Sequence, residues 1–159
     1  MISIGVDMNE VQRVLERVRE TVDFENVDLS DINASSSDGD NALHVVVRWN
    51  DLGAATVLIN AGIDINKSGD LGYTPLHIAC MQGNLEIVKL LVAKGADMFA
   101  LSEGAPPFTN ARLAGNDEIC GFLEPLMQEA QRRDPKIRLK SRVVRLRAEL
   151  AQLEAELTE

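Results

Sequence analysis

Aromatic residues, histidine and cysteine are all scarce in this chain. Its 159 residues include one Trp, one Tyr, four Phe, two His and two Cys, while hydrophobic residues make up 45% of the total. A core built on aromatic rings is therefore excluded, and aliphatic side chains must do the packing. Cys80 and Cys120 fall in separate predicted helices, so we expect reduced thiols without a disulfide or a redox role.

Long apolar runs are also absent. No stretch approaches the roughly 20 apolar residues of a membrane span, and residues 1–7 have neither a basic region nor an apolar run of signal length. We therefore expect a cytoplasmic protein without a membrane partner.

Basic residues are few outside the C-terminal segment. Residues 1–134 hold 10 basic and 21 acidic residues, a net charge of −11, whereas residues 135–159 hold six basic and four acidic residues. An acidic body disfavours nucleic acid as a ligand and favours a basic protein partner, although acidity can also serve solubility alone.

The most informative feature that is present is a period of 33 residues. Residues 70–97 have the sequence DLGYTPLHIACMQGNLEIVKLLVAKGAD, and parts of this sequence recur in earlier segments of the chain. The matched positions are Leu43 with Leu76, His44 with His77, Gly62 with Gly95, Asp64 with Asp97, Gly39 with Gly72, and Asp31–Asn33 with Asp64–Asn66. At a period of 32 the pattern continues downstream, where Pro107, Ala111 and Gly115 match Pro75, Ala79 and Gly83. Such a period indicates stacked units that bury their faces against one another.

These motifs resemble the ankyrin-repeat family. The resemblance is carried by Gly72, Thr74-Pro75-Leu76-His77, Ala79, Gly83, the segment Glu86–Leu91 and Gly95-Ala96-Asp97. It implies an all-α ankyrin-repeat solenoid of helix-turn-helix units with hairpin loops, here in three repeats at residues 34–66, 67–99 and 100–131. The third repeat is degenerate, because Phe108 and Thr109 stand where the other two repeats have Leu and His.

Additional helices are expected on both sides of the repeat domain, which spans residues 28–134. A capping helix is predicted within residues 1–27, where Val11, Val14, Leu15, Val18 and Val22 recur at helical spacing. Pro125 lies inside the last helical stripe of the repeats, so we expect a kink or a restart there. Asp134 and Pro135 then suit the N-cap and first position of a further helix over residues 135–159.

This C-terminal amphipathic helix carries an apolar seam with the spacing of a coiled coil. The seam residues are spaced 4, 3, 4, 3 and 4 apart: Leu139, Val143, Leu146, Leu150, Leu153 and Leu157. The helix is basic first and acidic last, which favours an antiparallel homodimer over a parallel one. The alternative is that the helix folds back as a cap on the third repeat and buries the seam there.

Residues with catalytic or metal-binding potential form no recognisable constellation. His44 and His77 occupy the repeat's Leu-His position, and the family resemblance implies that each ties neighbouring hairpins together by hydrogen bonds. No third ligand accompanies them, and the acidic turn at residues 35–40 lacks the spacing of a calcium loop. We expect no enzyme activity, no metal and no cofactor.

The family resemblance also implies where a partner binds. Ankyrin folds present the hairpin tips and the exposed side of each first helix as a concave surface. By register, the tip residues are Asp38, Asp40, Asp70, Leu71, Tyr73 and Glu103, and the helix residues are Arg48, Trp49, Met81, Gln82 and Leu113.

The single Trp and the single Tyr both fall in this set, where stacking of the repeats does not demand an aromatic ring. Aromatic anchors inside an acidic rim are typical of a protein interface. Two alternatives are that Trp49 packs down against the second repeat, and that the C-terminal segment lies in the groove.

These observations predict a non-catalytic protein–protein interaction module. The leading interpretation is an inhibitor or immunity-type protein that binds a basic partner through its acidic concave surface. The alternative is an adaptor that bridges two partners, with the C-terminal helix used for dimerisation or a second contact.

Overall fold

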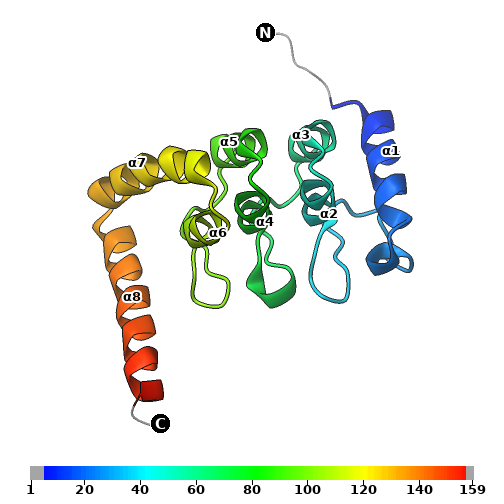
Figure 1. The fold of residues 1–159 in the computed structure, drawn as a ribbon. Helices are drawn as coiled ribbons and strands as arrows, with labels where there is room; N and C mark the ends of the chain where they lie inside the picture. The colour runs from blue at the N-terminus through cyan, green and yellow to red at the C-terminus, as the bar shows by residue number, and fades with distance from the viewer. Residues whose placement is uncertain (1–5, 157–159) are drawn as a thin grey trace.

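The computed structural model describes residues 6–156, which form a row of paired helices (Figure 1). The α-helices are α1 (Met8–Arg19), α2 (Ala42–Arg48), α3 (Leu52–Asn60), α4 (Pro75–Gln82), α5 (Leu85–Ala93), α6 (Pro107–Leu113), α7 (Asp117–Arg133) and α8 (Pro135–Glu156). Two short 3₁₀ helices, η1 (Val22–Phe24) and η2 (Asp70–Gly72), lie between them. Within residues 6–156 there is no β-strand, only isolated bridges that close two hairpins. The predicted all-α repeat solenoid is confirmed.

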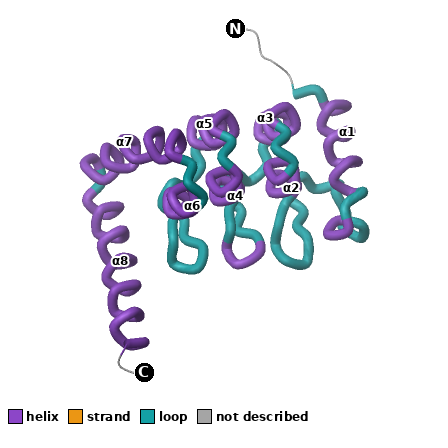
Figure 2. The backbone as a smooth tube through the Cα atoms, viewed as in Figure 1, coloured by secondary structure: helices purple, strands orange, loops and turns teal. Residues whose placement is uncertain are grey.

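The helices lie in two rows. Helices α2, α4 and α6 pack side by side in one row, and α3, α5 and α7 form the other (Figure 1). The hairpin loops that precede α2, α4 and α6 all project to the same side of the molecule (Figure 2). The hairpins and the α2–α4–α6 row therefore share one continuous side, and α1 packs against α2 and α3 at one end.

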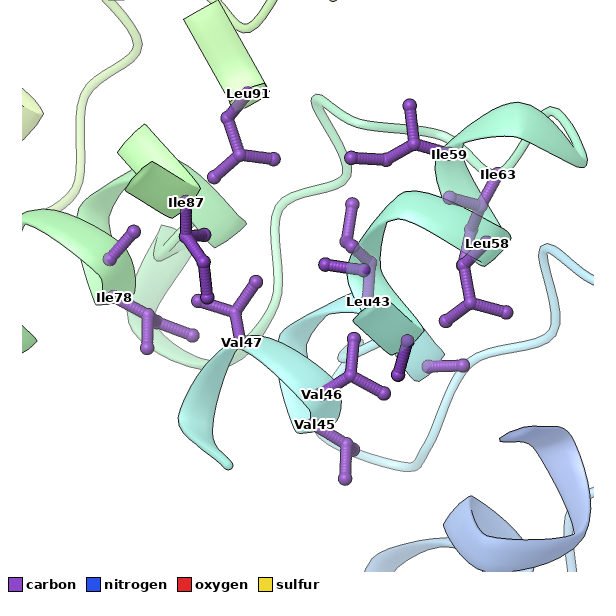
Figure 3. Close-up of a cluster of buried hydrophobic side chains, with 14 of the residues drawn as sticks. Leu43, Val45, Val46, Val47, Leu58, Ile59, Ile63, Ile78, Ile87 and Leu91 are labelled. Atoms are coloured by element: carbon purple, nitrogen blue, oxygen red, sulfur yellow. The ribbon is translucent and has the colours of Figure 1, made fainter. Parts of the chain in front are cut away.

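The core between the rows is aliphatic, as the scarcity of aromatic residues requires. Leu43 of α2, Leu58 of α3, and Ile87 and Leu91 of α5 are completely buried and belong to one apolar cluster that runs along the neighbouring repeats (Figure 3). Phe24 of η1 is the one fully buried aromatic side chain among the described residues. Each repeat buries its apolar face only against its neighbours, so stability is shared along the row.

The N-terminal helix forms largely as predicted. Asp7 caps α1 by accepting a hydrogen bond from the Asn9 N–H at 2.9 Å, and Val11, Val14, Leu15 and Val18 are buried. The prediction that Val22 belongs to the buried face of this helix is wrong, because its side chain is 88% exposed. The helix ends at Arg19, so the helical spacing no longer holds at residue 22.

A ladder of asparagine side chains links successive hairpins. The Asn33 Oδ1 accepts the backbone N–H of Asp64 at 2.7 Å, and the Asn66 Oδ1 accepts that of Asp97 at the same distance. The two segments matched by the 33-residue period are therefore equivalent, as predicted.

Helix α7 continues through Pro125, so the restart expected there is wrong. Proline cannot donate to the carbonyl four residues earlier, and its ring crowds that carbonyl. The residue concerned is Gly121, whose position is open and exposed. Water can therefore take the place of the lost hydrogen bond.

Candidate functional site

The tips of the second and third hairpins have the same unusual backbone. Leu71 and Glu103 have φ angles of 51° and 49°, and the glycine after each also has a positive φ. A left-handed conformation costs a non-glycine residue about 1 kcal/mol. Leu71 is nevertheless 62% exposed, so a large apolar side chain is held in water by a strained turn. The second hairpin therefore presents an apolar side chain to solvent at a strained backbone position.

A concavity of about 250 Å³ lies beside the tip of the second hairpin. Its lining residues are Arg48, Asp70, Leu71, Tyr73, Ile78, Met81 and Gln82, which we call the Tyr73 concavity. Six of the seven were singled out from the sequence. Ile78 was missed because it reads as a core position, although it stands one helical turn before Met81 on the same face of α4.

The walls of the Tyr73 concavity are mainly apolar, and its polar groups are partly occupied. The Gln82 Nε2 donates to the backbone carbonyl oxygen of Arg48 at 3.0 Å, which fixes α4 to the end of α2. The Arg48 guanidinium forms an ion pair with Asp40. Its charge is therefore largely compensated, and Asp70 contributes the exposed carboxylate at this site.

The sequence predicted Asp40 as an exposed residue at the rim of the partner surface. This prediction is wrong, because only 4% of Asp40 is accessible to solvent. Besides pairing with Arg48, its carboxylate accepts the backbone N–H of Asp70 at 3.2 Å. A Cβ atom at Gly69 would lie 1.7 Å from the Asp40 Oδ1, so only glycine leaves room for this contact. Asp40 thus ties the second hairpin to α2 and has a structural role.

Trp49 is not among the residues that line the Tyr73 concavity, which sets it apart from Tyr73, the other aromatic residue of the predicted surface. The Arg17 guanidinium of α1 lies over the indole ring, 5.0 Å from its centroid, and also donates to Asp51 at 3.0 Å. This distance suits a cation–π contact. Trp49 is 38% exposed, and Arg17 of α1 covers part of its ring.

The remaining predicted partner residues extend the surface without lining the concavity. Asp38 and Glu103 are exposed at the first and third hairpins, and Leu113 of α6 is 80% exposed. Each hairpin therefore carries one exposed acid, at Asp38, Asp70 and Glu103, and within residues 6–156 none of the three forms an ion pair. We call the Tyr73 concavity together with Asp38, Glu103 and Leu113 the hairpin surface.

Both histidines bridge neighbouring hairpins, which confirms their predicted role. The Nδ1 atoms of His44 and His77 accept the backbone N–H groups of Asn41 and Thr74, each at 3.1 Å. Their Nε2 atoms therefore carry the proton and donate to the carbonyl oxygens of Tyr73 (3.0 Å) and Ala105 (3.2 Å). Burial lowers the pKa of both imidazoles, and Asp40 partly opposes this effect at His44. The rings are held neutral with both nitrogens occupied.

Both thiols have raised pKa values. Burial, with a smaller effect of Cys120, raises the pKa of Cys80 to about 12, and desolvation also raises the pKa of Cys120. Both are free and stay protonated at neutral pH.

No three His, Cys, Asp or Glu side chains of the described residues lie close enough together to hold a metal ion.

None of the helices within residues 6–156 combines the length and hydrophobicity needed to cross a bilayer.

The stacked helix pairs and their projecting hairpins define a helical repeat protein. The family model of ankyrin repeats (3 copies) matches residues 8–102, which is more than half of the chain. The chain belongs to the ankyrin-repeat family. The match begins in α1 and ends at the third hairpin, and α6 and α7 continue the same stacking beyond it.

Several curated proteins are similar to this chain. Human "Protein phosphatase 1 regulatory subunit 27" is 36% identical over 89 residues, covering 56% of each protein. Mouse "Protein phosphatase 1 regulatory subunit 12A" is 32% identical over 141 residues, covering 83% of this chain and 13% of that protein. "Tyrosine-protein kinase Shark" of Drosophila melanogaster is 36% identical over 94 residues, covering 58% of this chain and 10% of that protein. The chain thus spans little more than half of the first relative and a small part of the others.

Proposed function

We propose that this chain is a non-catalytic inhibitor that occludes a basic protein partner through its hairpin surface. The Tyr73 concavity carries the proposal, because it joins apolar walls to an exposed carboxylate at a strained and exposed hairpin tip. A partner segment with an apolar side chain beside Lys or Arg would satisfy both features. The acids at Asp38 and Glu103 extend the same charge to the neighbouring hairpins.

The names of two relatives support a regulatory role. Both are called regulatory subunits of protein phosphatase 1, so they act on an enzyme that is a separate protein. By analogy, we propose that the partner here is an enzyme with a basic surface. We also place the protein in the cytoplasm, because free thiols persist in a reducing compartment.

Affinity capture from the native cytosol, with identification by mass spectrometry, tests the inhibitor proposal. The baits are the wild-type chain, Asp70→Lys in the Tyr73 concavity, and Glu16→Lys on the exposed side of α1 as a control with the same change of charge. We expect one basic protein at 1:1 stoichiometry on wild type and Glu16→Lys, and its loss on Asp70→Lys. A partner retained equally by all three baits would contradict a role for the hairpin surface.

The second candidate function is an adaptor, which one observation favours. The apolar seam of α8 is exposed at each of its five described residues, so the chain presents a second surface besides the hairpin surface. In this case α8 contacts a second protein or a second copy of the chain. Capture of two unrelated proteins, one lost on Asp70→Lys and the other on deletion of residues 135–159, would favour the adaptor over the inhibitor.

A further inference from the structure

Helix α8 stands apart from the repeats. It leaves the outer end of α7 and extends beyond the stack on the side of the hairpins, and its main contact is with α7 (Figure 1). Asp134 sets the change of direction, because its backbone is extended and its carboxylate caps the new helix by accepting the Lys136 N–H at 2.8 Å. The predicted start of this helix is confirmed. The alternative in which α8 folds back on the third repeat is wrong.

The apolar seam of α8 is left in water. Its described members are between 38% and 62% exposed: Leu139, Val143, Leu146, Leu150 and Leu153. Leu157, the sixth predicted member, lies outside the described residues. A regular stripe of large apolar side chains on a helix with few other contacts is typical of a surface that pairs with another helix.

The charge of α8 reverses near its middle. Residues 135–148 contain six basic residues and no acidic one, whereas residues 149–159 contain four acidic residues and no basic one. A helix with this distribution is complementary to itself when reversed. In a parallel pair, each half would instead lie beside a half of the same sign.

We propose that α8 pairs with α8 of a second copy of this chain as a short antiparallel coiled coil. With the two helices centred on residue 148, Val143 faces Leu153 and Leu146 faces Leu150 of the other copy. Arg142 then flanks Glu156 of the other copy, so each basic half lies along an acidic half. In this register the apolar seam residues face one another, and residues of opposite charge lie side by side.

Pairing through α8 gives the dimer two copies of the hairpin surface, so it binds two partner molecules, one for each chain, and the stoichiometry remains 1:1. This consequence rests on the proposed function of the hairpin surface. The pairing itself does not, and it is measured without any partner present.

Light scattering of the full chain tests the pairing. At about 50 µM we expect twice the chain mass of 17.4 kDa, and dissociation on dilution. Leu146→Asp with Leu150→Asp should give a monomer with an unchanged melting temperature, because both side chains are already exposed in the single chain. Ala148→Asp with Ala151→Asp adds the same charge at positions outside the seam and should remain a dimer.

Charge variants determine the direction of pairing. In the antiparallel register, Arg142→Glu places like charges beside Glu156 and should weaken the dimer roughly tenfold, and adding Glu156→Arg should restore it. In a parallel register Arg142 flanks Arg147 instead, so Arg142→Glu would strengthen the dimer.

Four results would overturn the proposal. The first is a wild-type protein that is monomeric at about 50 µM, and the second is a dimer that Arg142→Glu strengthens. The third is a dimer that Asp70→Lys abolishes. The fourth is a monomeric wild-type protein that binds anionic phosphatidylserine vesicles through α8. The third would place α8 in the hairpin surface of another copy. The fourth would assign the seam to a lipid surface.

Discussion

Replacing His77 with alanine should destabilise the repeats substantially. The change removes the acceptor of the Thr74 backbone N–H and the donor to the Ala105 carbonyl, and it leaves a cavity beside a fully buried position. Thr74 is itself buried, so its N–H finds no water, whereas Ala105 is half-buried and can be hydrated. One fully unsatisfied group, one partly unsatisfied group and the cavity together cost about 3 kcal/mol. For a chain of this length, that corresponds to a fall in Tm of roughly 10 °C.

The same reasoning gives a pH dependence. Burial lowers the pKa of folded His77 below the ordinary value of 6.5, so the unfolded state takes up the proton first as the pH falls. The stability contributed by the neutral ring is complete above pH 6.5 and is lost as the pH falls towards the lowered pKa. Wild type should therefore lose stability more steeply below pH 6.5 than His77→Ala.

Urea denaturation followed by circular dichroism at several pH values measures both effects. His77→Gln keeps a donor and an acceptor at the end of its side chain and should recover part of the lost stability. A loss below about 1 kcal/mol for His77→Ala would refute the bridging role, because an unmet buried N–H alone costs that much. Stoichiometric metal in the purified protein that disappears on this substitution would refute it as well.

Three further predictions follow from the hairpin surface and its supports. Leu71→Gly should leave the unfolding free energy within about 0.5 kcal/mol of wild type, because relief of the left-handed strain offsets the entropy cost of glycine, while capture of the partner falls roughly tenfold. Asp40→Ala should lower the unfolding free energy by about 1 kcal/mol, because the backbone N–H of Asp70 loses its acceptor while the exposed Arg48 guanidinium is hydrated. Exposed Asp38→Ala should change it little in the same denaturation experiment. Trp49→Ala should cost about 1 kcal/mol through the lost contact with Arg17 and leave capture of the partner unchanged.

Local patterns in the sequence predicted most of the fold and of the Tyr73 concavity. A fixed period determines which residues occupy equivalent places in successive repeats. Asn33 and Asn66 match in this period, and each accepts a hydrogen bond from a backbone N–H of the next hairpin. The same register identified Tyr73 and Met81 as positions that stacking of the repeats does not prescribe; Met81 is exposed, and Tyr73 is partly buried against the core.

Contacts between segments outside the period could not be predicted in this way. The burial of Asp40 depends on the space left by Gly69 in the next hairpin, which no pattern within the first repeat reports. Trp49 is covered by Arg17 of α1, which lies in the N-terminal helix outside the predicted repeats. The end of α1 at Arg19 likewise left Val22 in water.

The most direct test of the central claim is the affinity of the captured partner for the wild-type chain and for Met81→Lys, measured by titration calorimetry. Met81 is exposed in the wall of the Tyr73 concavity, so lysine there should leave the fold intact while opposing a basic partner segment. We predict 1:1 binding that weakens when salt is raised from about 50 to about 300 mM, and a Kd roughly 30-fold higher for Met81→Lys. Equal Kd values for the two proteins would show that the partner binds elsewhere.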